Sequence, residues 1–269
     1  MYFADRLESD LNYSTLLVKD SDGVRTITLN RPERRNAMTP EMQMELISAM
    51  EDVTASTCLA VVFRGAGDAF CAGLDLAALQ AMKGKTEAEY TEDAEMVAKL
   101  FRTLYELPKP TIAAVHGPAI AGGTGLATIC DLTFATPTAK FGYTEARIGF
   151  VPALVSAFLA LQIGDKLSRD LLLTGRIFEA AEAYRLGLVN EVVSAETLDV
   201  RVREVTELLT MNSSESLAAT KRLMAVQNKA WLDTAIAEAM KANAQSRSTA
   251  DFAEGVAAFL EKRKAIWTR

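Results

Sequence analysis

Short, almost wholly apolar segments recur along the chain and alternate with longer segments whose apolar residues repeat at helical spacing. The short segments are residues 58–63, 111–115, 132–135 and 188–193. Runs of this length that are rich in β-branched residues are typical of strands covered on both faces, as in a parallel sheet. Strands that alternate with helices indicate an α/β fold with a mostly parallel sheet.

The N-terminal part of the chain predicts a hairpin followed by a helix. Over residues 15–30, two stretches with a period of two flank an Asp-Ser-Asp-Gly turn at 20–23. Thr39 is a good N-cap, and Pro40 suits the first helical position. We therefore expect a helix from residue 40 to about residue 55.

The C-terminal part contains helical periodicity only. From about residue 195 onward no strand pattern is found, and the chain closes with an amphipathic segment at 251–266. We therefore divide the protein into a core of residues 1–194 and a helical region of residues 195–269. The apolar stripe of such a region must pack on the core or on a neighbouring subunit.

Charge and cysteine content exclude several classes of protein. The 269 residues include 29 Lys and Arg against 35 Asp and Glu, with no dense basic run, which disfavours nucleic acid or an anionic membrane as a partner. No apolar stretch is long enough to cross a bilayer, and the first residues lack an export signal. Cys58, Cys71 and Cys130 are odd in number and dispersed. We therefore expect neither a disulfide framework nor a zinc cluster, and a reducing, cytoplasmic location.

Two glycine-rich turns follow predicted strands, at residues 65–75 and 117–125. Glycine lets the main chain approach a ligand closely, and a helix that begins after such a turn has free N–H groups. Two turns of this kind could direct two amides at one oxygen atom. For either turn taken alone, a tight connection between a strand and a helix is the preferred explanation.

Few side chains are candidates for nucleophilic or metal chemistry. His116 is the only histidine and stands at the end of a predicted strand, so we interpret it as structural. No neighbour in the sequence activates the thiol of Cys71. Carboxylates and histidines do not cluster at metal-ligand spacing, and we expect no metal site.

Glu145 is the carboxylate with the most unusual setting, because apolar residues surround it within 141–152. Partial desolvation there would raise its pKa towards working pH and suit it to acid–base catalysis. A salt bridge to Arg147, or a place at a helix N-terminus, explains the residue equally well. Asp75 and Asp131 stand at element boundaries, and we interpret both as caps.

Several motifs occur in an order that is typical of one protein family. They are residues 30–38, 70–75, 117–125, 130–131, 141–142 with Glu145, 173–176 and 180–193. Together they resemble the enoyl-CoA hydratase/isomerase (crotonase) superfamily over nearly the whole chain, and bacterial enoyl-CoA or methylglutaconyl-CoA hydratases most of all. The resemblance implies a crotonase-like spiral of ββα turns whose C-terminal helical region trimerises, so we expect a homotrimer or a hexamer of two trimers.

The resemblance also implies an acyl-CoA thioester as substrate, with coenzyme A as part of that substrate and no separate cofactor. Members of the superfamily polarise the thioester carbonyl with two backbone amides, which here would belong to Cys71 and Gly122. The expected contacts to coenzyme A are Arg34, Ala37, Ala69, Ala72, Gly73, Leu74 and Lys264.

The chain departs from the family pattern at one catalytic position. The best-known hydratases carry two glutamates, and Gly125 stands where the first would be, whereas Glu145 matches the second. We expect hydration of a 2-enoyl-CoA to a 3-hydroxyacyl-CoA, with Glu145 relaying protons through the water. Moving a double bond between C3 and C2 needs only one base, so a Δ3,Δ2-enoyl-CoA isomerase is the alternative. A non-catalytic acyl-CoA-binding subunit is a third hypothesis.

Overall fold

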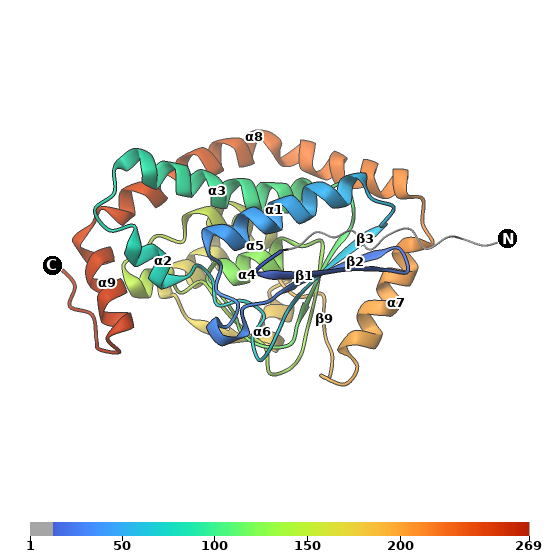
Figure 1. Ribbon diagram of the computed structural model, residues 1–269, viewed down its shortest axis with the longest axis horizontal. Helices are drawn as coiled ribbons and strands as arrows, with labels where there is room; N and C mark the ends of the chain where they lie inside the picture. The colour runs from blue at the N-terminus through green and yellow to red at the C-terminus, as the bar shows by residue number, and fades with distance from the viewer. Residues whose placement is uncertain (1–12, 269) are drawn as a thin grey trace.

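A six-stranded sheet forms the centre of the protein in the computed structural model, which describes residues 13–268 (Figure 1). Its strands run in the order β1-β2-β3-β4-β6-β9, and every neighbouring pair is parallel except β1 with β2. The strands are β1 (Leu16–Ser21), β2 (Val24–Leu29), β3 (Ala60–Gly65), β4 (Thr111–Val115), β6 (Leu132–Ala135) and β9 (Glu191–Val192). The predicted α/β class with a mostly parallel sheet is confirmed.

A second, smaller sheet has three strands in the order β5-β7-β8. These are β5 (Ala119–Ile120), β7 (Lys140–Gly142) and β8 (Ile177–Glu179). β5 and β7 are parallel, and β7 and β8 are antiparallel. This sheet positions two segments of the site. β5 lies within the second glycine-rich turn, just before α4, and β7 ends three residues before Glu145.

The predicted hairpin and first helix are confirmed. β1 and β2 pair from Leu16 with Leu29 down to Ser21 with Val24, and both Asp22 and Gly23 of the turn have positive φ. Positive φ at both central positions matches the right-handed twist of the flanking strands. Thr39 caps the first helix by accepting a hydrogen bond from the Met42 N–H at 3.2 Å.

Helices cover both faces of the large sheet (Figure 1). They are α1 (Pro40–Ala55), α2 (Leu76–Ala81), α3 (Glu87–Glu106), α4 (Gly122–Ile129), α5 (Ala153–Thr174), α6 (Ala180–Arg185), α7 (Leu198–Thr210), α8 (Ser214–Arg247) and α9 (Ala250–Leu260), with 3-10 helices η1 (Pro32–Arg34) and η2 (Glu145–Ile148). α7 packs on β3, β4 and β6 through Leu198, Val202 and Val205. The long helix α8 packs along α3 and α5 of its own chain.

Two segments differ from their predicted structure. Only Glu191–Val192 of the apolar run 188–193 forms a strand, because the N–H groups of Leu188 and Val189 donate to the Ala183 carbonyl at the end of α6. The amphipathic segment predicted at 251–266 is helical only to Leu260. Beyond it the chain turns back, and Arg263 pairs with Glu254 of α9.

Helices α2 and α9 lie together at one end of the molecule, opposite the end that carries α7 (Figure 1). Helix α9 also packs closely on η2. This end holds the candidate site described below. In the part of the chain that the structure describes, no helix has both the length and the apolar character that crossing a bilayer requires.

Candidate active site

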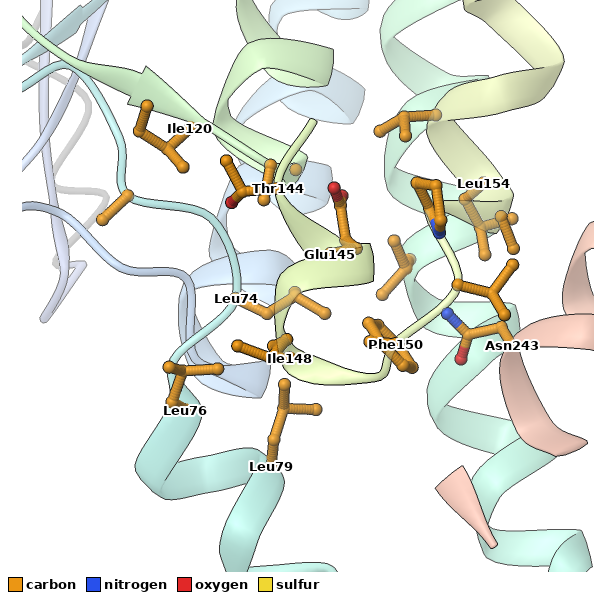
Figure 2. Close-up of a pocket in the computed structure, with 18 of the residues that line it drawn as sticks. Leu74, Leu76, Leu79, Ile120, Thr144, Glu145, Ile148, Phe150, Leu154 and Asn243 are labelled. Atoms are coloured by element: carbon orange, nitrogen blue, oxygen red, sulfur yellow. The ribbon is translucent and has the colours of Figure 1, made fainter. Parts of the chain in front are cut away.

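An apolar cavity opens between the first glycine-rich turn, η2, the start of α5 and the two C-terminal helices (Figure 2). It encloses about 790 Å³ of space, part of it open to solvent. Thr144, Glu145 and Asn243 provide the polar side chains of its lining, and all other lining residues are apolar or glycine. A concave apolar site with a few convergent polar groups is the usual form of a small-molecule site.

Glu145 is the first residue of η2, and its side chain reaches into this cavity (Figure 2). The residue is only 8% exposed, and its Oε2 atom has no hydrogen-bond partner among residues 13–268. Burial raises the pKa of Glu145 from its ordinary 4.5 to about 7. The salt bridge to Arg147 is not formed among the described residues, whereas the place at a helix N-terminus is, because Glu145 begins η2.

Two glycines allow α9 to press against the short helix that carries Glu145. A Cβ atom on Gly149 would overlap the Asp251 carbonyl, and one on Gly255 would overlap the Ile148 carbonyl. Gly149 also has a φ of 67°, which L side chains rarely adopt. The close approach fixes the far end of η2 and brings Phe259 of α9 to the cavity.

In the first glycine-rich turn, the backbone amide that we predicted to be free is already hydrogen-bonded within the chain. The Cys71 N–H already donates to the Pro118 carbonyl at 3.2 Å, and Cys71 does not line the cavity. The prediction that Cys71 supplies one of two free amides is therefore wrong. Cys71 forms a parallel β-bridge with Ala119, and its N–H donates within that bridge. The spacing of residues in the sequence does not show this pairing.

Leu74 carries the free amide of this turn. Met38 and Leu74 form a parallel β-bridge. In this bridge the Met38 N–H donates to the Gly73 carbonyl at 2.7 Å, and the Met38 carbonyl accepts from the Asp75 N–H at 2.9 Å. In such a bridge the N–H of the central residue points away from the partner strand. The Leu74 N–H accordingly has no acceptor among the described residues, and Leu74 lines the cavity.

The second glycine-rich turn presents a helix N-terminus to the same cavity. Ala121 takes φ 53° and ψ −124°, and α4 begins directly after it at Gly122. The N–H of a first helical residue has no partner within its own helix, and that of Gly122 has none elsewhere among residues 13–268. The two turns are in contact, because a Cβ on Gly73 would lie 3.4 Å from the Gly122 nitrogen.

Gly125 faces apolar side chains. A Cβ at this position would lie 2.6 Å from Val155 Cγ1 and 3.3 Å from Phe101 Cζ. The space that a longer side chain would need is thus already filled by α5 and α3. Among the described lining residues, Glu145 is the one ionisable group.

Of the residues predicted to contact coenzyme A, the structure brings Ala72, Gly73 and Leu74 to the cavity or its edge. Ala37 and Ala69 are buried nearby, where their carbonyls accept from Arg31 Nη1 and Asn36 Nδ2. Arg34 and Lys264 are exposed, and neither lines the cavity.

The remaining candidates are structural. His116 Nε2 contacts the Gly67 carbonyl at 2.8 Å, and burial raises the pKa of the Cys71 thiol to about 12, which removes its nucleophilic form. Asp75 caps α2 as predicted, accepting from the Ala77 and Ala78 N–H groups. The prediction that Asp131 is a cap is wrong, because it joins the Thr111 N–H to Lys221 of α8.

Several lining residues were not predicted from the sequence, among them Phe101 of α3, Asn243 of α8 and Phe259 of α9. Asn243 and Phe259 come from the helical region about 100 residues after Glu145. A polar residue on the apolar face of a long helix was the available signal for Asn243.

Comparison with known proteins identifies the family of this chain. Residues 19–269 match the sequence model described as enoyl-CoA hydratase/isomerase. The chain belongs to the enoyl-CoA hydratase/isomerase family. A Thermus thermophilus protein provisionally named enoyl-CoA hydratase is 44% identical over 89% of this chain and 95% of its own length. The short-chain-enoyl-CoA hydratase of Clostridium acetobutylicum is 31% identical over 94% of this chain and 97% of its own.

Solved structures of the enoyl-CoA hydratase/isomerase family share the fold. A crystal structure of an enoyl-CoA hydratase/isomerase from Xanthobacter autotrophicus Py2 superposes with a TM-score of 0.86, at 31% identity, over 96% of this chain and all of that one. The predicted superfamily and its crotonase-like fold are confirmed, and the chain is an enzyme of that family.

Proposed function

We propose that this protein adds water across the double bond of a 2-enoyl-CoA thioester to form a 3-hydroxyacyl-CoA. The observation that carries the proposal is the buried, unpaired carboxyl group of Glu145 inside an apolar cavity that two free backbone amides also reach. The names of the relatives support the same reaction.

The amides of Leu74 and Gly122 hold the thioester oxygen in this proposal. Both residues line the cavity, and the two turns that carry them are in contact. As water attacks C3, negative charge moves onto the thioester oxygen, where fixed N–H donors stabilise it. One such donor is typically worth about 2.7–4 kcal/mol of transition-state stabilisation.

Glu145 acts as base and then as acid. Its carboxylate takes one proton from water while the water oxygen bonds to C3, and an enolate forms towards C2. The carboxyl group then returns a proton to C2, so that one water is added in total. A pKa of about 7 allows both steps near neutral pH, since acceptor and donor forms are both accessible.

The enoyl-CoA isomerase reaction is a second candidate, favoured by the apolar contact at Gly125. Because Val155 occupies the space of a second acid, the cavity has one base to orient water. An isomerase needs only one, which takes a proton from C2 of a 3-enoyl thioester and returns it at C4, so that the double bond moves from C3–C4 to C2–C3. Incubation with 2-enoyl and 3-enoyl thioesters and identification of the products decides between them. A hydroxyacyl product supports hydration, a shifted alkene alone supports isomerisation, and binding without product supports a non-catalytic subunit.

We propose that Ala72, Gly73 and Leu74 contact the pantetheine end of coenzyme A. Arg34 and Lys264 are exposed cations, and we propose that they bind its phosphate groups.

We also propose that the C-terminal helices form a homotrimer, or a hexamer of two trimers. Apolar side chains that are exposed in the single chain support this, because they need a cover. They are Leu208, Met211, Leu223, Met224 and Val226. Light scattering after gel filtration measures the subunit number.

A further inference from the structure

We propose that Asn243 determines substrate specificity by donating a hydrogen bond from its side-chain amide to a neutral oxygen atom on the acyl chain. The inference rests on the function proposed above and narrows its substrate. The acyl chain would carry a ketone or a hydroxyl group in addition to the double bond.

Asn243 stands on α8 and is the polar residue that this helix contributes to the cavity. Figure 2 shows it at the side of Phe150, away from Thr144 and Glu145. The residue is only 3% exposed. A purely hydrocarbon chain would leave an amide at this place without a partner, and buried polar groups in proteins are normally paired.

The orientation of the Asn243 amide follows from its neighbour. Arg247 Nε donates to Asn243 Oδ1 at 3.1 Å. A guanidinium group can only donate, so the oxygen of the amide must face it and the NH₂ group must face the other way. Among residues 13–268 no acceptor contacts Asn243 Nδ2. The cavity therefore receives a hydrogen-bond donor.

Arg247 itself is held from three directions. Its side chain is 1% exposed and pairs with Asp93 of α3, Nη1 donates to Met82 Sδ at 3.2 Å, and the guanidinium lies 5.5 Å from the centre of the Phe150 ring. Burying the Arg247–Asp93 ion pair costs free energy of desolvation. The pair holds Arg247 in place, and Arg247 in turn holds the Asn243 amide with its NH₂ group towards the acyl chain.

Charge indicates that the partner oxygen is neutral. Asp93 already balances the charge of Arg247, and no cation lines the cavity among the described residues. A carboxylate on the acyl chain would enter an apolar site that holds Glu145 and no compensating charge, which is unfavourable. A ketone or hydroxyl oxygen accepts the same hydrogen bond without that cost.

The variant Asn243→Asp tests the proposal, because it keeps an oxygen facing Arg247 and replaces the NH₂ donor by an acceptor. We would measure kcat/KM for 2-enoyl-CoA esters of equal length with and without a ketone at C5, C6 or C7. The wild type should prefer at least one ketone ester over its plain counterpart by about tenfold or more. Asn243→Asp should reduce that preference to near one. Asn228→Asp, on the same helix but bonded to the Tyr105 hydroxyl, should keep it.

Hydroxyl-bearing esters separate the two sources of oxygen. An aspartate can accept from a hydroxyl group, so a hydroxyl ester should retain its preference in Asn243→Asp while a ketone ester loses it. The absence of any preference in the wild type, or an equal loss for plain and oxygenated esters in the variant, would overturn the proposal.

Binding of the saturated ketone and plain acyl-CoA esters, measured by calorimetry, tests the inference separately from turnover. A ketone preference in Kd that Asn243→Asp removes supports it even if no ester is hydrated, in which case the proposed reaction alone fails. Equal Kd values for both esters in the wild type count against it.

Discussion

A methyl group of Val155 lies against Gly125, at the point where a side chain on residue 125 would begin. The separation between a Cβ at this position and Val155 Cγ1 would be only 2.6 Å. The chain has no second acid at position 125, and an apolar side chain from α5 fills the space that the side chain of such an acid would need. The cavity is therefore built around Glu145 as its one ionisable group among the described residues.

Substituting both partners tests this relationship. Gly125→Glu alone overpacks the helix against Val155, and we expect it to lower the free energy of unfolding by about 1–3 kcal/mol or more. Gly125→Glu combined with Val155→Ala should recover most of that loss and raise the ratio of hydrated to isomerised product. Urea denaturation and product analysis measure the two effects. A fully stable Gly125→Glu single variant would contradict the packing described here.

Glu145→Gln removes the proposed acid and base while keeping the shape of the side chain. We expect turnover to fall by about 10²–10⁴-fold, because a neutral amide can neither take the proton of water nor return one to C2. Binding of a saturated acyl-CoA ester, measured by calorimetry, should change little. Unchanged turnover would remove Glu145 from the mechanism.

The pH dependence of hydration follows from the raised pKa of Glu145. Below a pKa of about 7 the group is protonated and cannot accept a proton from water. We therefore expect kcat/KM to rise about tenfold per pH unit below pH 7 and to level off above it. Initial rates with a thioester that does not titrate in this range give the profile. A profile that is already level at pH 5 would show that the carboxyl group titrates near its ordinary value.

Gly255→Ala should destabilise the protein although alanine normally favours a helix. The exchange of glycine for alanine inside a helix usually adds about 1 kcal/mol of stability. Here the new Cβ would overlap the Ile148 carbonyl, so α9 must move away from η2. We expect a lower melting temperature and a lower kcat/KM, since η2 carries Glu145. A stabilised variant would show that α9 does not hold η2 in place.

Local chemistry made much of this protein predictable from its sequence. The Asp22-Gly23 turn and the Thr39 cap depend only on neighbouring residues, and both formed as expected. Glu145 was recognisable because apolar residues surround it in sequence as well as in space. The motifs identified the family because their order along the chain can be read without knowledge of tertiary contacts.

Tertiary structure alone decided which groups meet in the cavity. Cys71 and Leu74 stand three residues apart in one turn, and only the pairing of the turn with Pro118 and Met38 shows that the first amide is used and the second is free. Asn243 reaches the cavity because α8 folds back along α3 and α5. A free N–H and a facing side chain are properties of long-range packing, because hydrogen bonds and steric contacts join atoms that the order of residues leaves far apart.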